Sequence, residues 1–140
     1  MKRWMLLLPL LGALAGCLQD TASYTVDARD HAITLVRNQV WPWQSTVDVE
    51  VMVLRMPECN GGGSIKAVAE DAVYNLYRAP DEYPEPIFML KVDNRVFAVS
   101  TQSCRLQEFG QKPDSLGQEV GQFKVMDGRF QFVATGKAGA

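Results

Sequence analysis

The sequence predicts a mainly β fold, a small antiparallel sandwich or open barrel of about seven strands with at most one short helix. Short runs of β-branched and aromatic residues follow one another, separated by turn signals. The dipeptides Asp93-Asn94 and Asp127-Gly128 stand between such runs and are typical of two-residue hairpin turns. A chain of 140 residues, 47% apolar and 21% charged, has the size and composition of one domain.

The first residues have the pattern of a secretory signal. The basic pair Lys2-Arg3 precedes an apolar run that ends in small residues. The apolar stretch 4–18 has 15 residues, fewer than the roughly 20 that cross a bilayer as a helix. We therefore interpret residues 1–16 as a signal peptide rather than a transmembrane segment.

This signal ends in Leu14-Ala15-Gly16-Cys17, which resembles the lipobox of bacterial lipoproteins. In that family the signal is cut before the cysteine, whose thiol and new amino group are both acylated. The resemblance implies that Cys17 is the lipid-attached first residue of the mature chain. An aspartate after the cysteine would retain such a protein in the inner membrane, and Leu18 stands there instead. The implied address is the outer membrane, facing the periplasm, with the inner membrane and the cell surface as open alternatives.

A short tether should hold the domain close to its membrane. We interpret residues 17–22 as the lipidated tether, whose five residues after Cys17 reach about 20 Å when extended, and residues 23–134 as a single β domain. Loss of residues 1–16 leaves 12 basic and 16 acidic residues, a net charge of −4. With no basic cluster and a pI near 5.4, the composition argues against nucleic-acid binding and against electrostatic attraction to anionic lipid.

Cys59 and Cys104 remain once Cys17 is assigned to lipid. An even pair in an oxidising compartment predicts one disulfide. It would close a loop of 46 residues and contribute roughly 4 kcal/mol in the chain-entropy model. The alternative is a reactive or metal-bound thiol pair, but the chain has no second ligand cluster and no Cys-X-X-Cys spacing.

The first half of the mature chain is expected to contain strands at residues 23–28, 33–37 and 47–53. One face of the third carries four valines at alternate positions: Val47, Val49, Val51 and Val53. On its other face two carboxylates precede Met52 and Leu54, so this face should be solvated at first and buried later.

The middle of the chain holds a glycine run, a segment that fits two structures and a proline-rich stretch. The segment Asn60-Gly61-Gly62-Gly63 is expected to form a turn, because glycine weakens any regular element. Residues 64–78 fit either a helix behind a Ser64 cap or a strand. We favour a strand at 72–78 with a helical turn before it. Three prolines make 79–86 a loop.

The last part predicts two hairpins. Strands 87–92 and 95–101 flank Asp93-Asn94, and strands 123–126 and 129–133 flank Asp127-Gly128. Residues 135–140 are expected to be a flexible tail.

No residue pattern indicates catalysis, a metal or a cofactor. The chain has one histidine, His31, and no triad is evident around it. Gly62-Gly63-Ser64 lacks the glycine that a nucleophile elbow needs two residues after the serine. The acidic side chains of the proline-rich loop match no calcium-binding spacing: Asp81, Glu82 and Glu85. The methionines of separate strands are interpreted as core packing rather than a copper site: Met52, Met56, Met89 and Met126.

Trp41-Pro42-Trp43 is the candidate partner surface. Two large aromatic side chains beside a proline in an expected loop form a rigid apolar knuckle. Three interpretations stay open for Trp41 and Trp43: docking of an envelope protein, capping of the β core, and contact with the lipid headgroup layer.

The expected function is therefore binding, as an envelope accessory protein whose partner is another membrane-associated protein. An inhibitor or capture module for a soluble protein such as lysozyme is the alternative, although the chain lacks the motifs of lysozyme inhibitors, and an enzyme comes third. Residues 56–59 (Met-Pro-x-Cys) and 101–104 (Ser/Thr-x-x-Cys) are similar to segments of uncharacterised proteobacterial lipoproteins. That similarity implies no activity, and the oligomeric state stays open.

Overall fold

Every regular element in the described part of the chain is a β-strand. The computed structural model describes residues 19–27, 30–39 and 41–136. Its strands are β1 (Gln19–Thr25), β2 (His31–Asn38), β3 (Thr46–Arg55), β4 (Cys59–Ala69), β5 (Tyr74–Arg78), β6 (Ile87–Val92), β7 (Arg95–Ser100), β8 (Leu106–Glu108), β9 (Gln118–Met126) and β10 (Arg129–Ala134). The all-β class is confirmed. About seven strands was too low a number, because these ranges hold ten strands, and no helical turn occurs in them.

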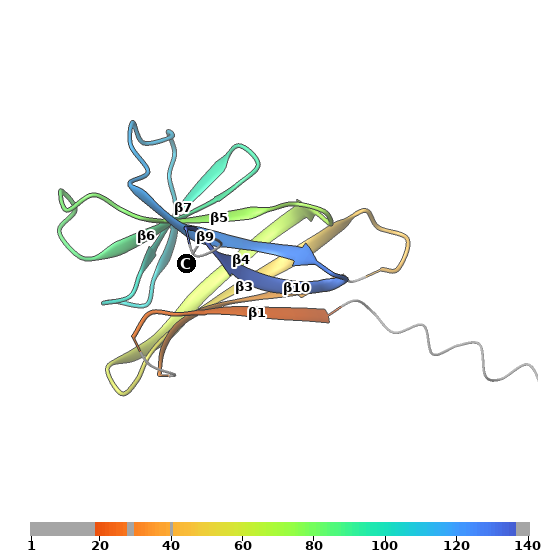
Figure 1. The fold of residues 1–140 in the computed structure, drawn as a ribbon, viewed down its shortest axis with the longest axis horizontal. Coiled ribbons are helices and arrows are strands. Elements are labelled where there is room, and N and C mark those ends of the chain that lie inside the picture. Colours follow the sequence, from red (N-terminus) through yellow and green to blue (C-terminus); the bar gives the residue numbers. More distant parts are fainter. Residues whose placement is uncertain (1–18, 28–29, 40, 137–140) are drawn as a thin grey trace, which may run out of the picture.

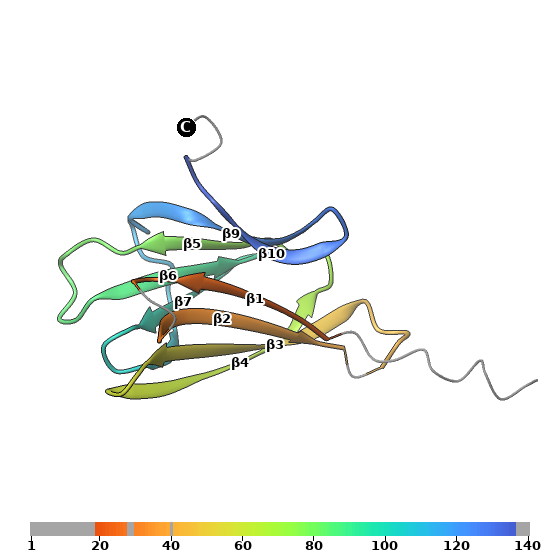
Figure 2. The ribbon, with the colours of Figure 1, turned by 60° about the horizontal axis from the view of Figure 1, so that its bottom comes forward.

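The strands form two open antiparallel sheets that face each other (Figure 1). A four-stranded sheet has the order β1-β2-β3-β4, and a six-stranded sheet has the order β10-β9-β5-β6-β7-β8. At one margin β1 lies against β10 without pairing to it. At the other margin a single parallel bridge joins Gly62 of β4 to Arg105. The fold is thus sandwich-like (Figure 2). The main core lies between the layers, and Ala79, Met89 and Val96 form a smaller separate cluster.

Strand β3 shows how the core forms. Its four valines at alternate positions are at most 1% exposed, and they pack with residues of the six-stranded sheet. The prediction that the other face becomes buried is wrong, since Met52 is 47% exposed. This face points away from the second sheet, so no layer covers it. Met56 and Met126 are exposed as well, so core packing is confirmed for only one of the four methionines, Met89.

The triple glycine belongs to a strand, contrary to the expected turn. Residues 61–63 pair with residues 51–53 of β3 inside β4. A Cβ at Gly61 would overlap the Cys104 carbonyl oxygen, and one at Gly62 would overlap the Val51 carbonyl oxygen. Glycine is required there because the backbone approaches too closely for a side chain. Residues 64–69 continue the strand, so the helical interpretation is wrong, whereas the strand expected at 72–78 is present as β5.

Both predicted hairpins are confirmed. Strands β6 and β7 flank Asp93-Asn94, and Asp93 has a φ of 54°. Strands β9 and β10 flank Asp127-Gly128, whose φ values of 54° and 76° suit a type I′ turn. β9 begins earlier than expected, at Gln118, and pairs with β5 as well as β10.

Strand β1 begins at Gln19 rather than at Ser23, so residues 19–22 are not a tether. They pair with residues 35–38 of β2, and their weak β propensity hid the strand from the sequence pattern. Ala22 is buried in the core. Residues 1–18, with the expected signal peptide and Cys17, lie outside the described residues, as do 137–140. Thr135, expected in the tail, donates its backbone N–H to the Val120 carbonyl oxygen.

The sandwich has two distinct ends. At one end of the sandwich β1 begins and β2 ends. The same end holds the β4–β5 connection at 70–73 and the β9–β10 turn at 127–128 (Figures 1 and 2). We call this the Gln19 end. The other end, which we call the Pro80 end, holds the β3–β4 turn at 56–58 and the proline-rich loop at 79–86.

Candidate functional site

Trp41 and Trp43 lie in the β2–β3 connection at the Gln19 end, and both are exposed. The two indole rings stack on each other, with centroids 5.2 Å apart and planes inclined by 21°. Trp41 is 51% exposed and Trp43 is 77% exposed. Capping of the β core is therefore the wrong interpretation, because both side chains are exposed and neither packs against the buried core. The Gln44 N–H donates to the Trp41 carbonyl oxygen at 3.1 Å, which closes the turn locally.

Arg37 fixes the base of this connection. Its guanidinium donates to the Asp20 carboxylate at 2.5 Å and to the Glu70 carbonyl oxygen at 2.8 Å. It also lies over the Phe130 ring, 4.3 Å from the centroid. The Arg37 side chain is only 3% exposed. Near the end of β2, just before the connection that carries the tryptophans, it links β1, the β4–β5 connection and β10.

A cleft of about 440 Å³ lies at the Pro80 end, between the two sheets. Residues near the start of β2 and the end of β3 line one side, and the 79–86 loop with β6 lines the other. The walls are partly apolar, with Val26, Ile87 and Phe88, and the polar part holds residues of both charges: Asp27, His31, Arg55, Arg78, Asp81 and Glu85.

The two arginines of the cleft are its unpaired cations. Neither Arg55 nor Arg78 forms an ion pair with a described residue. Arg78 lies over the Phe88 ring at 5.7 Å, a contact that leaves its N–H groups available. His31 contacts the Asp27 carboxylate through Nδ1 at 3.2 Å, and its buried Nε2 has no hydrogen-bond partner among the described residues. The cleft therefore offers charged donors beside an apolar wall.

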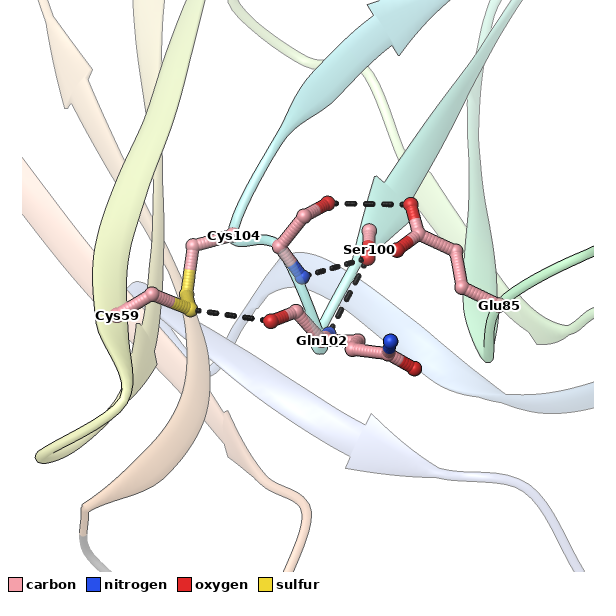
Figure 3. Close-up of a disulfide and its surroundings, with 6 residues drawn as sticks. Cys59, Glu85, Ser100, Gln102 and Cys104 are labelled. Carbon is pink, nitrogen blue, oxygen red and sulfur yellow. Dashed lines mark hydrogen bonds between the residues drawn. A yellow bond between two sulfur atoms is a disulfide. The ribbon is translucent and has the colours of Figure 1, made fainter.

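A disulfide borders the same end of the molecule. Cys59 and Cys104 are joined, with Cα atoms 6.0 Å apart, so the predicted pairing is confirmed (Figure 3). The Ser100 hydroxyl accepts the backbone N–H groups of Gln102 and Ser103. The Ser103 hydroxyl donates to Glu85 at 3.1 Å, which ties the proline-rich loop to the disulfide corner.

The acidic loop and Trp-Pro-Trp were visible in the sequence, whereas the cleft was not. Its arginines come from the ends of β3 and β5, which are brought together only by the packing of two sheets. Among the described residues no group of three or more His, Cys, Asp or Glu side chains is placed to hold a metal ion. Likewise, this part of the chain contains no helix long and apolar enough to span a membrane.

A scan against protein-family models finds no match, and neither the curated proteins nor the solved structures contain a match to this chain.

Proposed function

We propose that the protein is a lipid-anchored envelope protein that acts by binding a protein partner at its Pro80 end. The observation that carries this proposal is the position of β1, which begins two residues after Cys17. A lipid on Cys17 would hold the Gln19 end at the membrane and direct the cleft away from it. The Cys59–Cys104 disulfide supports an oxidising compartment, and we propose the periplasmic face of the outer membrane.

The composition of the cleft favours a polypeptide over a small anion. Two arginines and three carboxylates line it, so its charges nearly cancel and a simple anion would gain little from them. An apolar wall beside polar and charged groups is the arrangement of protein–protein interfaces, in which the rim is solvated and the centre is dry. The proposed partner is an envelope protein that presents both carboxylates and apolar side chains.

Substitution Cys17→Ser tests the anchor. The variant should move from the membrane fraction to the soluble periplasm, or stay uncut, because acylation is needed for processing in proteins with a lipobox. Thr21→Ala, an exposed change in β1, is the control and should fractionate like the wild type. A Cys17→Ser protein that is cut and still sediments with membranes contradicts the anchor.

Photo-crosslinking in intact cells tests the binding site. A photoreactive residue at position 81, in the cleft, should capture one discrete envelope protein, while the same residue at position 52, on the outer face of β3, should not. The double variant Arg55→Glu, Arg78→Glu should abolish the crosslinked product at position 81. Its melting temperature should stay unchanged, because neither arginine lies in the core. Equal products from both positions, or a product that survives the charge reversal, contradict the proposed site.

A further inference from the structure

We infer that the stacked pair Trp41 and Trp43 lies in the headgroup layer of the bilayer, as a second contact that sets the orientation of the anchored domain. The inference rests on the proposed anchor at Cys17 and names what the exposed tryptophans touch. Indole rings are enriched at membrane interfaces because one part is apolar and the N–H remains hydrated.

Covalent distance places the pair beside the anchor. Cys17 is two residues before Gln19, so its Cα lies within about 7 Å of the start of β1. Gln19 pairs with Asn38 across the sheet, and Trp41 follows three residues later, within about 11 Å of chain. A bilayer that holds acyl chains on Cys17 is therefore within reach of both rings, which project from the same end of the sandwich.

The exposed apolar surface is concentrated at this end. Seven large apolar side chains of the described residues are exposed, and five of them belong to the Gln19 end: Trp41, Trp43, Val73, Val125 and Met126. Solvent-exposed apolar groups gathered at one end indicate a contact surface, and the neighbouring lipid anchor makes the bilayer its nearest occupant.

The charges near the tryptophan pair indicate that the contact does not depend on the charge of the lipid headgroups. No basic residue lies among residues 41–45, the nearby Arg37 is buried and paired with Asp20, and the exposed Arg129 at the same end closely follows the acidic Asp127. The mature chain carries a net charge of −4. Contact should therefore depend on burial of the indole rings and neither require anionic lipid nor weaken with salt.

Tryptophan fluorescence reports on this pair alone. The chain has three tryptophans, and Trp4 leaves with the signal peptide. Lipidated protein, purified from membranes and reconstituted in phosphatidylcholine vesicles, should show blue-shifted emission. Lipids brominated near the ester end of the acyl chain should quench it more than lipids brominated near the terminal methyl. Anionic phosphatidylglycerol and added salt should leave the quenching unchanged.

Matched variants locate the contact. Trp43→Phe and Trp41→Phe isolate each ring, and both should keep the wild-type melting temperature because the rings are exposed. Trp43, which remains in Trp41→Phe, should be quenched more strongly than Trp41, which remains in Trp43→Phe. In a background that lacks both rings, Glu82→Trp places a tryptophan at the exposed Pro80 end, and its emission should stay solvent-like and unquenched.

Flotation separates the two hypotheses. Protein that fails to float with the vesicles contradicts the lipid anchor itself. Protein that floats while its tryptophans emit as in water overturns the headgroup contact and leaves the anchor intact; the pair would then be exposed for a protein partner. Equal quenching at positions 43 and 82 also overturns the inference, because the domain would lie flat on the bilayer.

Discussion

Tyr74 is the residue at which burial acts most strongly on a titratable group. Its side chain is fully buried at the start of β5 and packs edge-on against Phe130, 5.9 Å between centroids. The hydroxyl has no hydrogen-bond partner among the described residues. Burial, opposed by nearby Arg37 and helped by Asp93, raises the pKa of Tyr74 from 10.0 to about 12. The site therefore favours the neutral phenol over the phenolate.

The raised pKa predicts a loss of stability at high pH. Between pH 10 and pH 12 the unfolded chain releases the Tyr74 proton and the folded chain keeps it. The free energy of unfolding should therefore fall as the pH rises through this window and level off above it. Tyr74→Phe should remove this part of the decline and change stability at pH 7 by less than about 1 kcal/mol, because the hydroxyl bonds to none of the described residues. Urea unfolding of the wild type and of Tyr74→Phe at a series of pH values measures the decline and the change at pH 7. If the free energy of unfolding falls equally with pH in the two proteins, Tyr74 contributes nothing to the decline.

At the scale of elements, β4 is a strand that carries three consecutive glycines. Close contacts with the Cys104 segment and with β3 require Gly61 and Gly62. At Gly63 an added Cβ would lie 3.2 Å from the flexible Leu106 side chain of β8, a tight contact. The disulfide then joins the first residue of β4 to the segment before β8. At this margin the two sheets are thus joined by close backbone contact between β4 and the Cys104 segment and by one disulfide bond.

Gly62→Ala should destabilise the protein by about 1–3 kcal/mol, since its φ of 128° is strained for alanine and the new Cβ would overlap Val51. Gly110→Ala is the matched control. That glycine has no neighbour within 4 Å of the added Cβ, so the change should be nearly neutral. Thermal and urea unfolding of both variants measure the difference, and a Gly62→Ala protein as stable as the Gly110→Ala protein would mean that β4 does not approach β3 this closely.

At the scale of the whole molecule, the sheets are joined at opposite margins by different means. The disulfide and the Gly62–Arg105 bridge link β4 to the β7–β8 region. Where β1 lies against β10 without pairing, Arg37 of β2 binds Asp20 of β1 and stacks on Phe130 of β10. The buried guanidinium therefore substitutes for a missing backbone ladder at the open margin.

Arg37→Met should cost about 2–4 kcal/mol of stability, because it removes a partly buried ion pair and a hydrogen bond to Glu70 together. Lys66→Met removes the exposed Lys66–Asp48 pair, whose lysine side chain is 72% exposed, and should cost less than about 1 kcal/mol. Urea unfolding compares the two. If both losses fall below about 1 kcal/mol, the open margin does not depend on Arg37.

The all-β class, both hairpins and the cysteine pairing followed from the sequence alone, because alternation, turn dipeptides and cysteine parity are local or countable features. The tertiary structure decided the rest. Glycines 61–63 form a strand because another segment packs against them, and β1 begins early because β2 pairs with it. The tryptophans stay exposed in a connection that contributes no residue to the core. The cleft with Arg55 and Arg78 likewise exists only where two sheets meet. Such features depend on contacts between residues distant in the chain, and no local pattern encodes them.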